Sequence, residues 1–160
     1  MALGRRRITS IRLVLRDDPA IDHSKSDYDA YVESCYQRKH LTLHNGDKAT
    51  EFELKPMTFA QREALPDYDN TATYVMRCAL KSVSNYIVYD DETDTESTLR
   101  PVEHTKVDGS PMVTVKWLAE AALPTDQVVP IITAINEITQ AKAPLSERSV
   151  PASGQDTPSS

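Results

Sequence analysis

The sequence predicts an α+β domain, in which a small antiparallel sheet, formed by an N-terminal strand and a hairpin, packs with roughly four to five helices. Three observations predict this class. Short stretches alternate apolar and polar residues, longer stretches repeat apolar residues every three to four positions, and turn residues or prolines separate them. We expect residues 1–142 to form a single domain with a basic arm at 1–7, and residues 143–160 to form a disordered tail rich in proline and serine.

The composition is that of a small acidic protein. Its 160 residues carry a formal net charge of −6, and a chain of this length can bury a core without disulfides or a structural metal. Because nucleic-acid affinity depends on clustered Lys and Arg, we expect no nucleic-acid partner. The apolar runs are too short to cross a bilayer, so we expect no membrane association and a cytoplasmic location.

The first predicted strand follows a basic triplet. Ile11 to Leu15 alternates in the manner of a half-buried strand, and the segment from Asp17 to Pro19 ends it. Arg5, Arg6 and Arg7 precede the strand. The triplet is either a solvated arm or a contact for an acidic partner.

The next element is a helix that Ser26 or Asp27 would cap. Its apolar face is spaced at three and four residues and comprises Tyr28, Tyr31, Val32, Cys35 and Tyr36. This tyrosine-rich face is either part of the core or a docking stripe for a partner.

A hairpin is predicted from Leu41 to Leu54, with its turn at Asn45-Gly46. His40 and His44 alternate onto one face of its first strand, but no third metal ligand is near them in the sequence. We therefore expect neither a metal nor another cofactor.

A strand-to-helix corner follows the hairpin. Pro56 ends the strand, Thr58 caps the next helix, and Gln61 stands where a capping box requires it. A further helix is predicted from Thr71 to about Asn85. The acidic run 90–96 lacks the central glycine and the terminal-glutamate spacing of a calcium loop and is predicted to be a flexible acidic loop.

The last third contains a turn and two helices. Asp108-Gly109 predicts a turn, and Pro111 places any pairing there at an edge. Thr114 would cap a helix that contains Trp117 and whose predicted inward face comprises Val115, Leu118, Ala119 and Ala122.

The final helix would cover residues 125–142, with Pro130 near its first turn. Its apolar seam includes Ile131, Ile135 and Ile138. The seam is either core or a face for a partner.

The sequence contains no recognisable catalytic, phosphate-binding or metal-binding motif. There is no G-x-S-x-G elbow, and four glycines leave no material for a phosphate-binding loop. Cys35 and Cys78 lack a Cys or His at metal-ligand spacing, so we expect reduced core thiols. We therefore expect a protein that is not an enzyme.

Three stretches together carry a family resemblance: LTLHNGDKATEFELKPMT, TYVMRCALKSVSN, and WLAEAALPTDQVVPIITAINEITQ followed by Leu145 to Glu147. Their order resembles that of the tail assembly chaperones of long-tailed bacteriophages. The resemblance implies a small β element, then helices, then a late helix before a disordered tail. It further implies a protein that binds the tape-measure protein and recruits tail-tube subunits in the host cytoplasm.

Three functional hypotheses follow. The candidate partner-binding residues are Tyr28, Tyr31, Trp117, Ile131, Ile135, Ile138, Arg5, Arg6 and Arg7. In an assembly chaperone, the Tyr28 and Tyr31 face and the exposed part of the Ile131 to Ile138 seam would hold an apolar partner helix. In a resident virion protein of the head, neck or tail, the termini would order against neighbouring subunits. A metal-dependent enzyme would use His40, His44 or the acidic run. A homo-oligomer is compatible with either assembly role.

Overall fold

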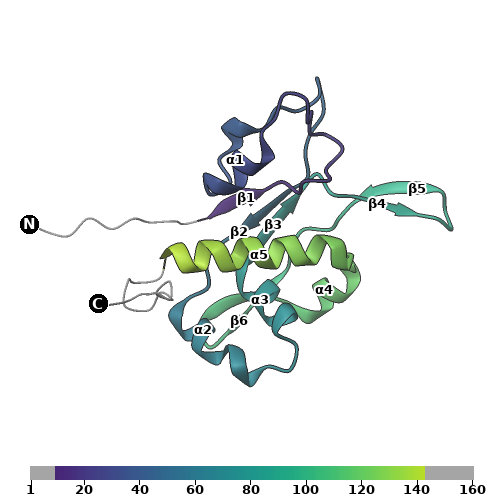
Figure 1. Cartoon of the computed structure of the whole chain (residues 1–160). Helices are drawn as coiled ribbons and strands as arrows, with labels where there is room; N and C mark the ends of the chain where they lie inside the picture. The colour runs from purple at the N-terminus through teal and green to yellow at the C-terminus, as the bar shows by residue number, and fades with distance from the viewer. Residues whose placement is uncertain (1–9, 143–160) are drawn as a thin grey trace, which may run out of the picture.

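The computed structural model describes residues 10–142 and confirms the α+β class. Five α-helices and seven strands, the latter in three small antiparallel sheets, are present within these residues (Figure 1). The predicted arm at 1–7 and the predicted tail at 143–160 lie outside the described residues.

The central sheet has the order β1-β2-β3 and is antiparallel throughout. Its strands are β1 (Ile11–Leu13), β2 (Glu51–Leu54) and β3 (Leu80–Ser84). β1 confirms the predicted N-terminal strand. Alternation along β2 places Phe52 and Leu54 in the core, and Glu51 and Glu53 on the opposite face.

The opposite face carries ion pairs. Glu51 lies 3.5 Å from Arg12 and 3.7 Å from Arg38. Glu53 lies 3.6 Å from Lys81 and accepts a hydrogen bond from Ser82. Partial burial raises the pKa of Glu53, but the Ser82 bond and the nearby cations outweigh it and hold the pKa below its usual value.

The hairpin predicted from Leu41 to Leu54 is wrong in its first arm. Leu43 forms only an isolated bridge with Ile21, and a short 3-10 helix, η1 (Arg38–His40), precedes it. The second arm is β2, which pairs with β1 and β3 instead. The reason is that β1 and β3 flank β2 on both edges and leave no edge for residues 41–43.

Helix α1 (Tyr28–Glu33) begins as predicted, because the Asp27 carboxylate accepts a hydrogen bond from the Ala30 amide. It ends earlier than predicted. Cys35 and Tyr36 have φ values of 63° and 66°, so the chain turns left-handed there. The Tyr36 amide donates to the Tyr31 carbonyl, which closes the helix.

The strand-to-helix corner forms as predicted. Thr58 and Gln61 make both bonds of a capping box at the start of α2 (Phe59–Ala64). A 3-10 turn, η2 (Leu65–Asp67), leads to α3 (Thr71–Ala79), which Asn70 caps. The prediction that α3 continues to about Asn85 is wrong, because the chain enters β3 directly at Leu80 and pairs with β2.

Two hairpins lie outside the central sheet. β4 (Ile87–Asp90) pairs with β5 (Thr95–Thr98), so the predicted flexible loop over the acidic run is wrong for residues 90, 95 and 96, which belong to strands. β6 (His104–Val107) and β7 (Ser110–Val113) pair around the predicted turn. Asp108 and Gly109 have φ values of 51° and 81° there, which a hairpin turn with two positive φ angles requires.

Helix α4 (Val115–Ala121) starts at the predicted Thr114 cap. Its predicted inward face is wrong for Val115, Ala119 and Ala122, which are exposed, and only Leu118 of that set is partly buried. Trp117 turns inward instead and is 1% exposed.

Helix α5 (Thr125–Lys142) follows. In Figure 1 it crosses the molecule beside the central sheet, and it contacts α3. Pro130 is the sixth residue of α5 and so lies inside the helix, beyond the predicted first turn.

One core joins the sheet to the helices. Its largest fully buried side chains are Val14, Tyr31, Phe52, Leu54, Cys78, Leu80, Val113, Trp117, Ile131, Ile135 and Ile138. Within residues 10–142, no helix combines the length and the apolar character that crossing a membrane requires.

Candidate partner-binding groove

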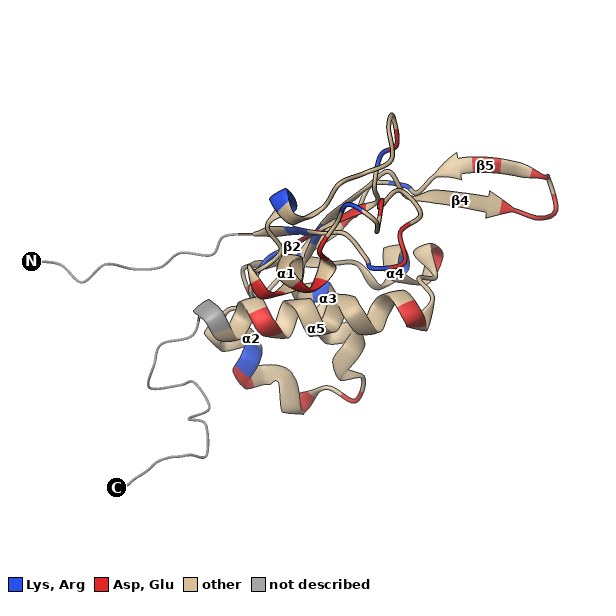
Figure 2. Ribbon diagram, turned by 45° about the horizontal axis from the view of Figure 1, so that its top comes forward, with Lys and Arg blue, Asp and Glu red and all other residues tan. Residues whose placement is uncertain are grey.

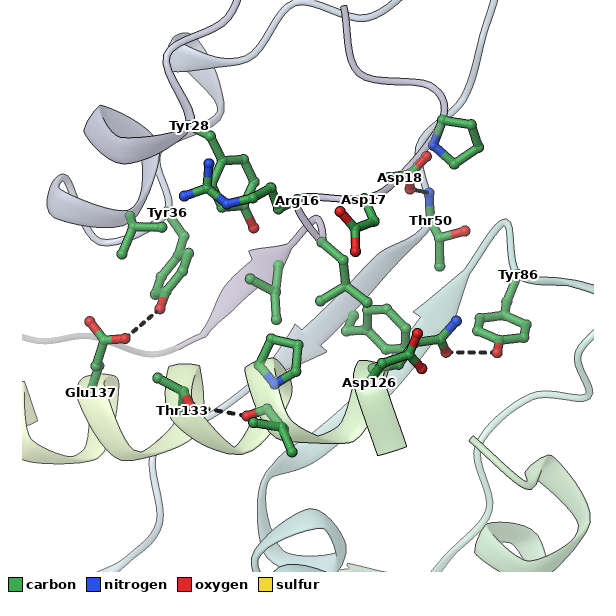
Figure 3. Close-up of a pocket in the computed structure, with 18 residues that line it drawn as sticks. Arg16, Asp17, Asp18, Tyr28, Tyr36, Thr50, Tyr86, Asp126, Thr133 and Glu137 are labelled. Atoms are coloured by element: carbon green, nitrogen blue, oxygen red, sulfur yellow. Dashed lines mark hydrogen bonds between the residues drawn. The ribbon is translucent and has the colours of Figure 1, made fainter. Parts of the chain in front are cut away.

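A groove of about 490 Å³ opens between α5, α1 and the end of β1 (Figure 3). Leu13 and Phe52 form its buried floor. Tyr28 and Val32 of α1 line one wall, and Val129 with its neighbour Pro130 lines the other. The lining is mostly apolar, which is typical of sites that take apolar side chains of a ligand or partner.

Two hydrogen bonds tie α5 to the rest of the fold along the groove (Figure 3). The Tyr86 hydroxyl donates to Gln127 at 2.7 Å, and the Tyr36 hydroxyl donates to Glu137 at 2.8 Å. Gln127 and Glu137 are ten residues apart in one helix, which corresponds to about 15 Å along its axis. The two hydrogen bonds therefore hold both ends of the α5 segment that lines the groove.

Tyr36 reaches Glu137 because of its backbone. Its positive φ turns the chain after α1 so that a tyrosine of the predicted helical face leaves the helix and points to α5 (Figure 3). Burial raises the pKa of the Tyr36 hydroxyl well above its usual range, and the bond to Glu137 raises it further. The hydroxyl therefore remains a donor at neutral pH.

Arg16 borders the groove next to Tyr28. Its guanidinium lies 4.5 Å from the centre of the Tyr28 ring and pairs with Asp29 at 2.9 Å. The Tyr28 hydroxyl donates to the Val14 carbonyl at 2.6 Å, and burial raises its pKa to about 12. These contacts fix Tyr28 in the wall of the groove.

The rim of the groove is mainly acidic. Asp17, Asp18, Asp126 and Glu137 line it, against the single cation Arg16 among its lining residues. Both oxygens of Asp18 are used by backbone amides, those of Ala20 and Thr50. An apolar segment flanked by Lys or Arg complements such a rim.

Pro130 adds a backbone feature to the wall. Proline has no amide hydrogen, so the carbonyl of Asp126, four residues earlier, receives no helical hydrogen bond from position 130. Both residues line the groove.

The structure separates the predicted site residues. Tyr28 lines the groove, whereas Tyr31 is fully buried and bonds to β1. Trp117 is buried and its Nε1 donates to the Arg100 carbonyl at 3.0 Å. These two side chains have no free surface for a partner in the folded domain, which corrects their predicted role.

Ile131, Ile135 and Ile138 are each 0% exposed. The seam of α5 is therefore core, because it contacts α3 and belongs to the same buried cluster as the side chains of the sheet, and its predicted role as a partner face is corrected in the same way. Arg5, Arg6 and Arg7 lie outside the described residues.

The candidate metal residues are not gathered. His44 Nδ1 lies 3.9 Å from Asp22, and no group of three or more potential ligands forms within residues 10–142. Cys35 and Cys78 form no disulfide with each other, and Cys78 is buried whereas Cys35 is only partly buried. Burial raises the pKa of the Cys78 thiol, which makes it a poor nucleophile.

The sequence reasoning missed the exposed wall of the groove. Val129 is 57% exposed and lies beside the seam, on the flank of α5. A usable signal was present, since Val128-Val129 makes the apolar stripe wider at this point than a buried seam needs. Tyr86 and Arg16 gave no comparable local signal.

Comparisons with known proteins add no family. No protein-family model matches the chain, and neither the curated proteins nor the solved structures contain a significant match to it.

Proposed function

We propose that the protein is a non-enzymatic phage morphogenesis protein, and specifically a tail assembly chaperone that holds the tape-measure protein and recruits tail-tube subunits. The observation that carries the proposal is the groove beside α5, which has an apolar lining, an acidic rim and an exposed valine. Three stretches of the sequence, residues 41–58, 73–85 and 117–140, resemble such chaperones in their order, and this resemblance supports the same proposal.

The groove specifies the chemistry of its occupant. Its length between the two anchoring hydrogen bonds, about 15 Å, matches about ten residues of a helix. Val129 and the neighbouring Pro130 would contact the apolar face of such a helix. The acidic rim would pair with Lys or Arg on its flanks, so we expect the bound tape-measure segment to be an amphipathic helix with basic edges.

The test compares two valines of equal exposure. Val129 is 57% exposed in the groove, and Val115 is 58% exposed on α4, outside it. Val129→Lys should abolish co-purification with the tape-measure protein of the same phage, because it places a cation against an apolar, basic-edged helix. Val115→Lys should leave co-purification unchanged. If both variants co-purify with the tape-measure protein to the same extent, the groove is not its binding site.

The alternative is a resident virion protein, in which the basic arm at 1–7 and the serine-rich tail at 143–160 would order only against neighbouring subunits. An immunoblot of infected-cell lysate and of purified virions from one preparation separates the two. Detection in lysate alone supports the chaperone. Detection in both, at a fixed ratio to the capsid protein, supports the virion protein, and absence from both excludes either role.

A further inference from the structure

The β4–β5 hairpin, residues 87–98, projects from the body of the protein (Figures 1 and 2). All eight of its strand residues are exposed. They include three large apolar side chains, Ile87 at 55%, Val88 at 36% and Tyr89 at 53%. An isolated two-stranded hairpin is only marginally stable in water, so a covering partner would stabilise it considerably.

Among the strands of residues 10–142, β4 and β5 pair only with each other, so each strand of the hairpin has one open edge there. An open edge presents unpaired amide and carbonyl groups to any strand that approaches. β4 carries the apolar residues, while β5 reads TEST and is polar. The outer edge of β4 is therefore the better template for an added strand.

The hairpin is also strongly acidic. Residues 87–98 contain no Lys or Arg, and their carboxylates are Asp90, Asp91, Glu92, Asp94 and Glu96. Figure 2 shows these charges along the hairpin and at its turn. A strand that pairs with β4 should therefore be basic.

The chain itself contains a segment of that description. The first 16 residues hold five arginines and no Asp or Glu, and residues 5–9 read RRRIT, three arginines followed by two β-branched residues. The described chain begins at residue 10, at the start of β1, and both views place this point at the opposite end of the molecule from the hairpin (Figures 1 and 2). A contact between two copies fits this placement better than a contact within one copy.

We propose that residues 5–9 of one copy add as a strand to the outer edge of β4 in a second copy, with Arg5, Arg6 and Arg7 against the acidic hairpin. The contact is heterologous, because the two surfaces differ and lie at opposite ends. Such contacts build either a ring or an open chain of copies. The inference does not depend on the phage assignment.

The test uses variants of the full chain in which charged side chains are replaced by uncharged Asn or Gln. The hairpin variant is Asp90→Asn, Asp91→Asn and Glu92→Gln, and the arm variant is Arg5→Gln, Arg6→Gln and Arg7→Gln. Light scattering over a concentration series should show self-association of the wild type that weakens with added salt. Each variant should associate about tenfold more weakly or worse.

Mixing gives the decisive result. Each variant keeps one intact surface, so an equimolar mixture should form a one-to-one complex that neither variant forms alone. A matched control neutralises three exposed acids elsewhere, through Glu63→Gln, Asp67→Asn and Asp69→Asn, and should associate like the wild type.

A second variant tests the apolar part without changing charge. Ile87→Ser with Tyr89→Ser should also weaken self-association, and both side chains are exposed, so the core stays intact. The proposal is overturned by a wild type that is monomeric at every concentration, by association that survives neutralising the hairpin, or by a mixture that remains monomeric.

Discussion

The hydroxyl of Tyr31 lies at the outer edge of β1, between Arg12 and Val14, the residue that follows the strand. It accepts a hydrogen bond from the Val14 amide at 2.9 Å and donates one to the Arg12 carbonyl, also at 2.9 Å. The Tyr28 hydroxyl donates a hydrogen bond to the Val14 carbonyl along the same edge. Because β1 is an edge strand, these groups would otherwise lack partners. Two tyrosines of α1 thus replace part of a fourth strand.

Tyr31→Phe tests this replacement. The substitution keeps the ring in the core but leaves the buried Val14 amide without its acceptor. The free energy of unfolding should fall by about 1–3 kcal/mol in urea denaturation. Tyr68→Phe, at a tyrosine that is 39% exposed, is the control and should change it by less than about 0.5 kcal/mol. Equal effects would show that water replaces the hydroxyl at Val14.

The tyrosines also predict how stability depends on alkaline pH. Burial raises the pKa of Tyr28, Tyr31, Tyr36 and Tyr74 above the usual value. The unfolded chain then loses these protons near pH 10 while the folded chain keeps them. Their contribution is complete below about pH 10 and is lost as pH rises toward the folded pKa values.

The measurement is a series of urea denaturation curves between about pH 9 and pH 12. Tyr74 belongs to this group because burial raises its pKa, and its bond with Cys78 raises it further. Tyr36→Phe removes one of the four groups and should make the decline with pH less steep. A stability that stays constant up to about pH 11 would contradict the raised pKa values.

The sequence predicted the elements whose signals are local. The caps Asp27, Thr58 and Thr114 each have a short polar side chain before a helical pattern, and the structure confirms all three. The β6–β7 turn was predictable for the same reason, since Asp108-Gly109 tolerates positive φ. Local chemistry determines where these elements begin and turn.

Elements that depend on distant partners were not predictable. Residues 80–84 continue the helical spacing of α3 without a Gly or Pro, and they become a strand only because β2 offers its edge. The groove is a stronger case. Arg16, Tyr86 and Val129 come from three distant parts of the chain, and no local pattern brings them together.

Thr139 makes another long-range contact that can be tested. Its hydroxyl, on the buried side of α5, accepts a hydrogen bond from the Met57 amide at 3.1 Å and so connects the last helix to the strand-to-helix corner. Thr139→Val keeps the shape but leaves this buried amide unpaired, which should lower the free energy of unfolding by about 1–3 kcal/mol.

The control for Thr139 lies on the same helix. Thr133 is exposed, and its hydroxyl bonds to the Val129 carbonyl within α5. Thr133→Val should change the stability in urea denaturation by less than about 0.5 kcal/mol. A loss at Thr139 no greater than that at Thr133 would mean that the corner does not depend on the α5 contact.

Ala122 predicts a stabilising substitution. It ends α4 in the left-handed conformation, with φ 47° and ψ 49°. A Cβ there costs about 1–2 kcal/mol, whereas glycine adds only the extra freedom of the unfolded chain, about 0.4–1 kcal/mol. Ala122→Gly should therefore raise the free energy of unfolding by roughly 0.5–1 kcal/mol.

The control is Ala119→Gly, at an exposed position inside α4, which should lower the free energy of unfolding by about 1 kcal/mol. Urea denaturation should thus give opposite signs, and a loss in both would show that α4 does not end in a left-handed residue in solution.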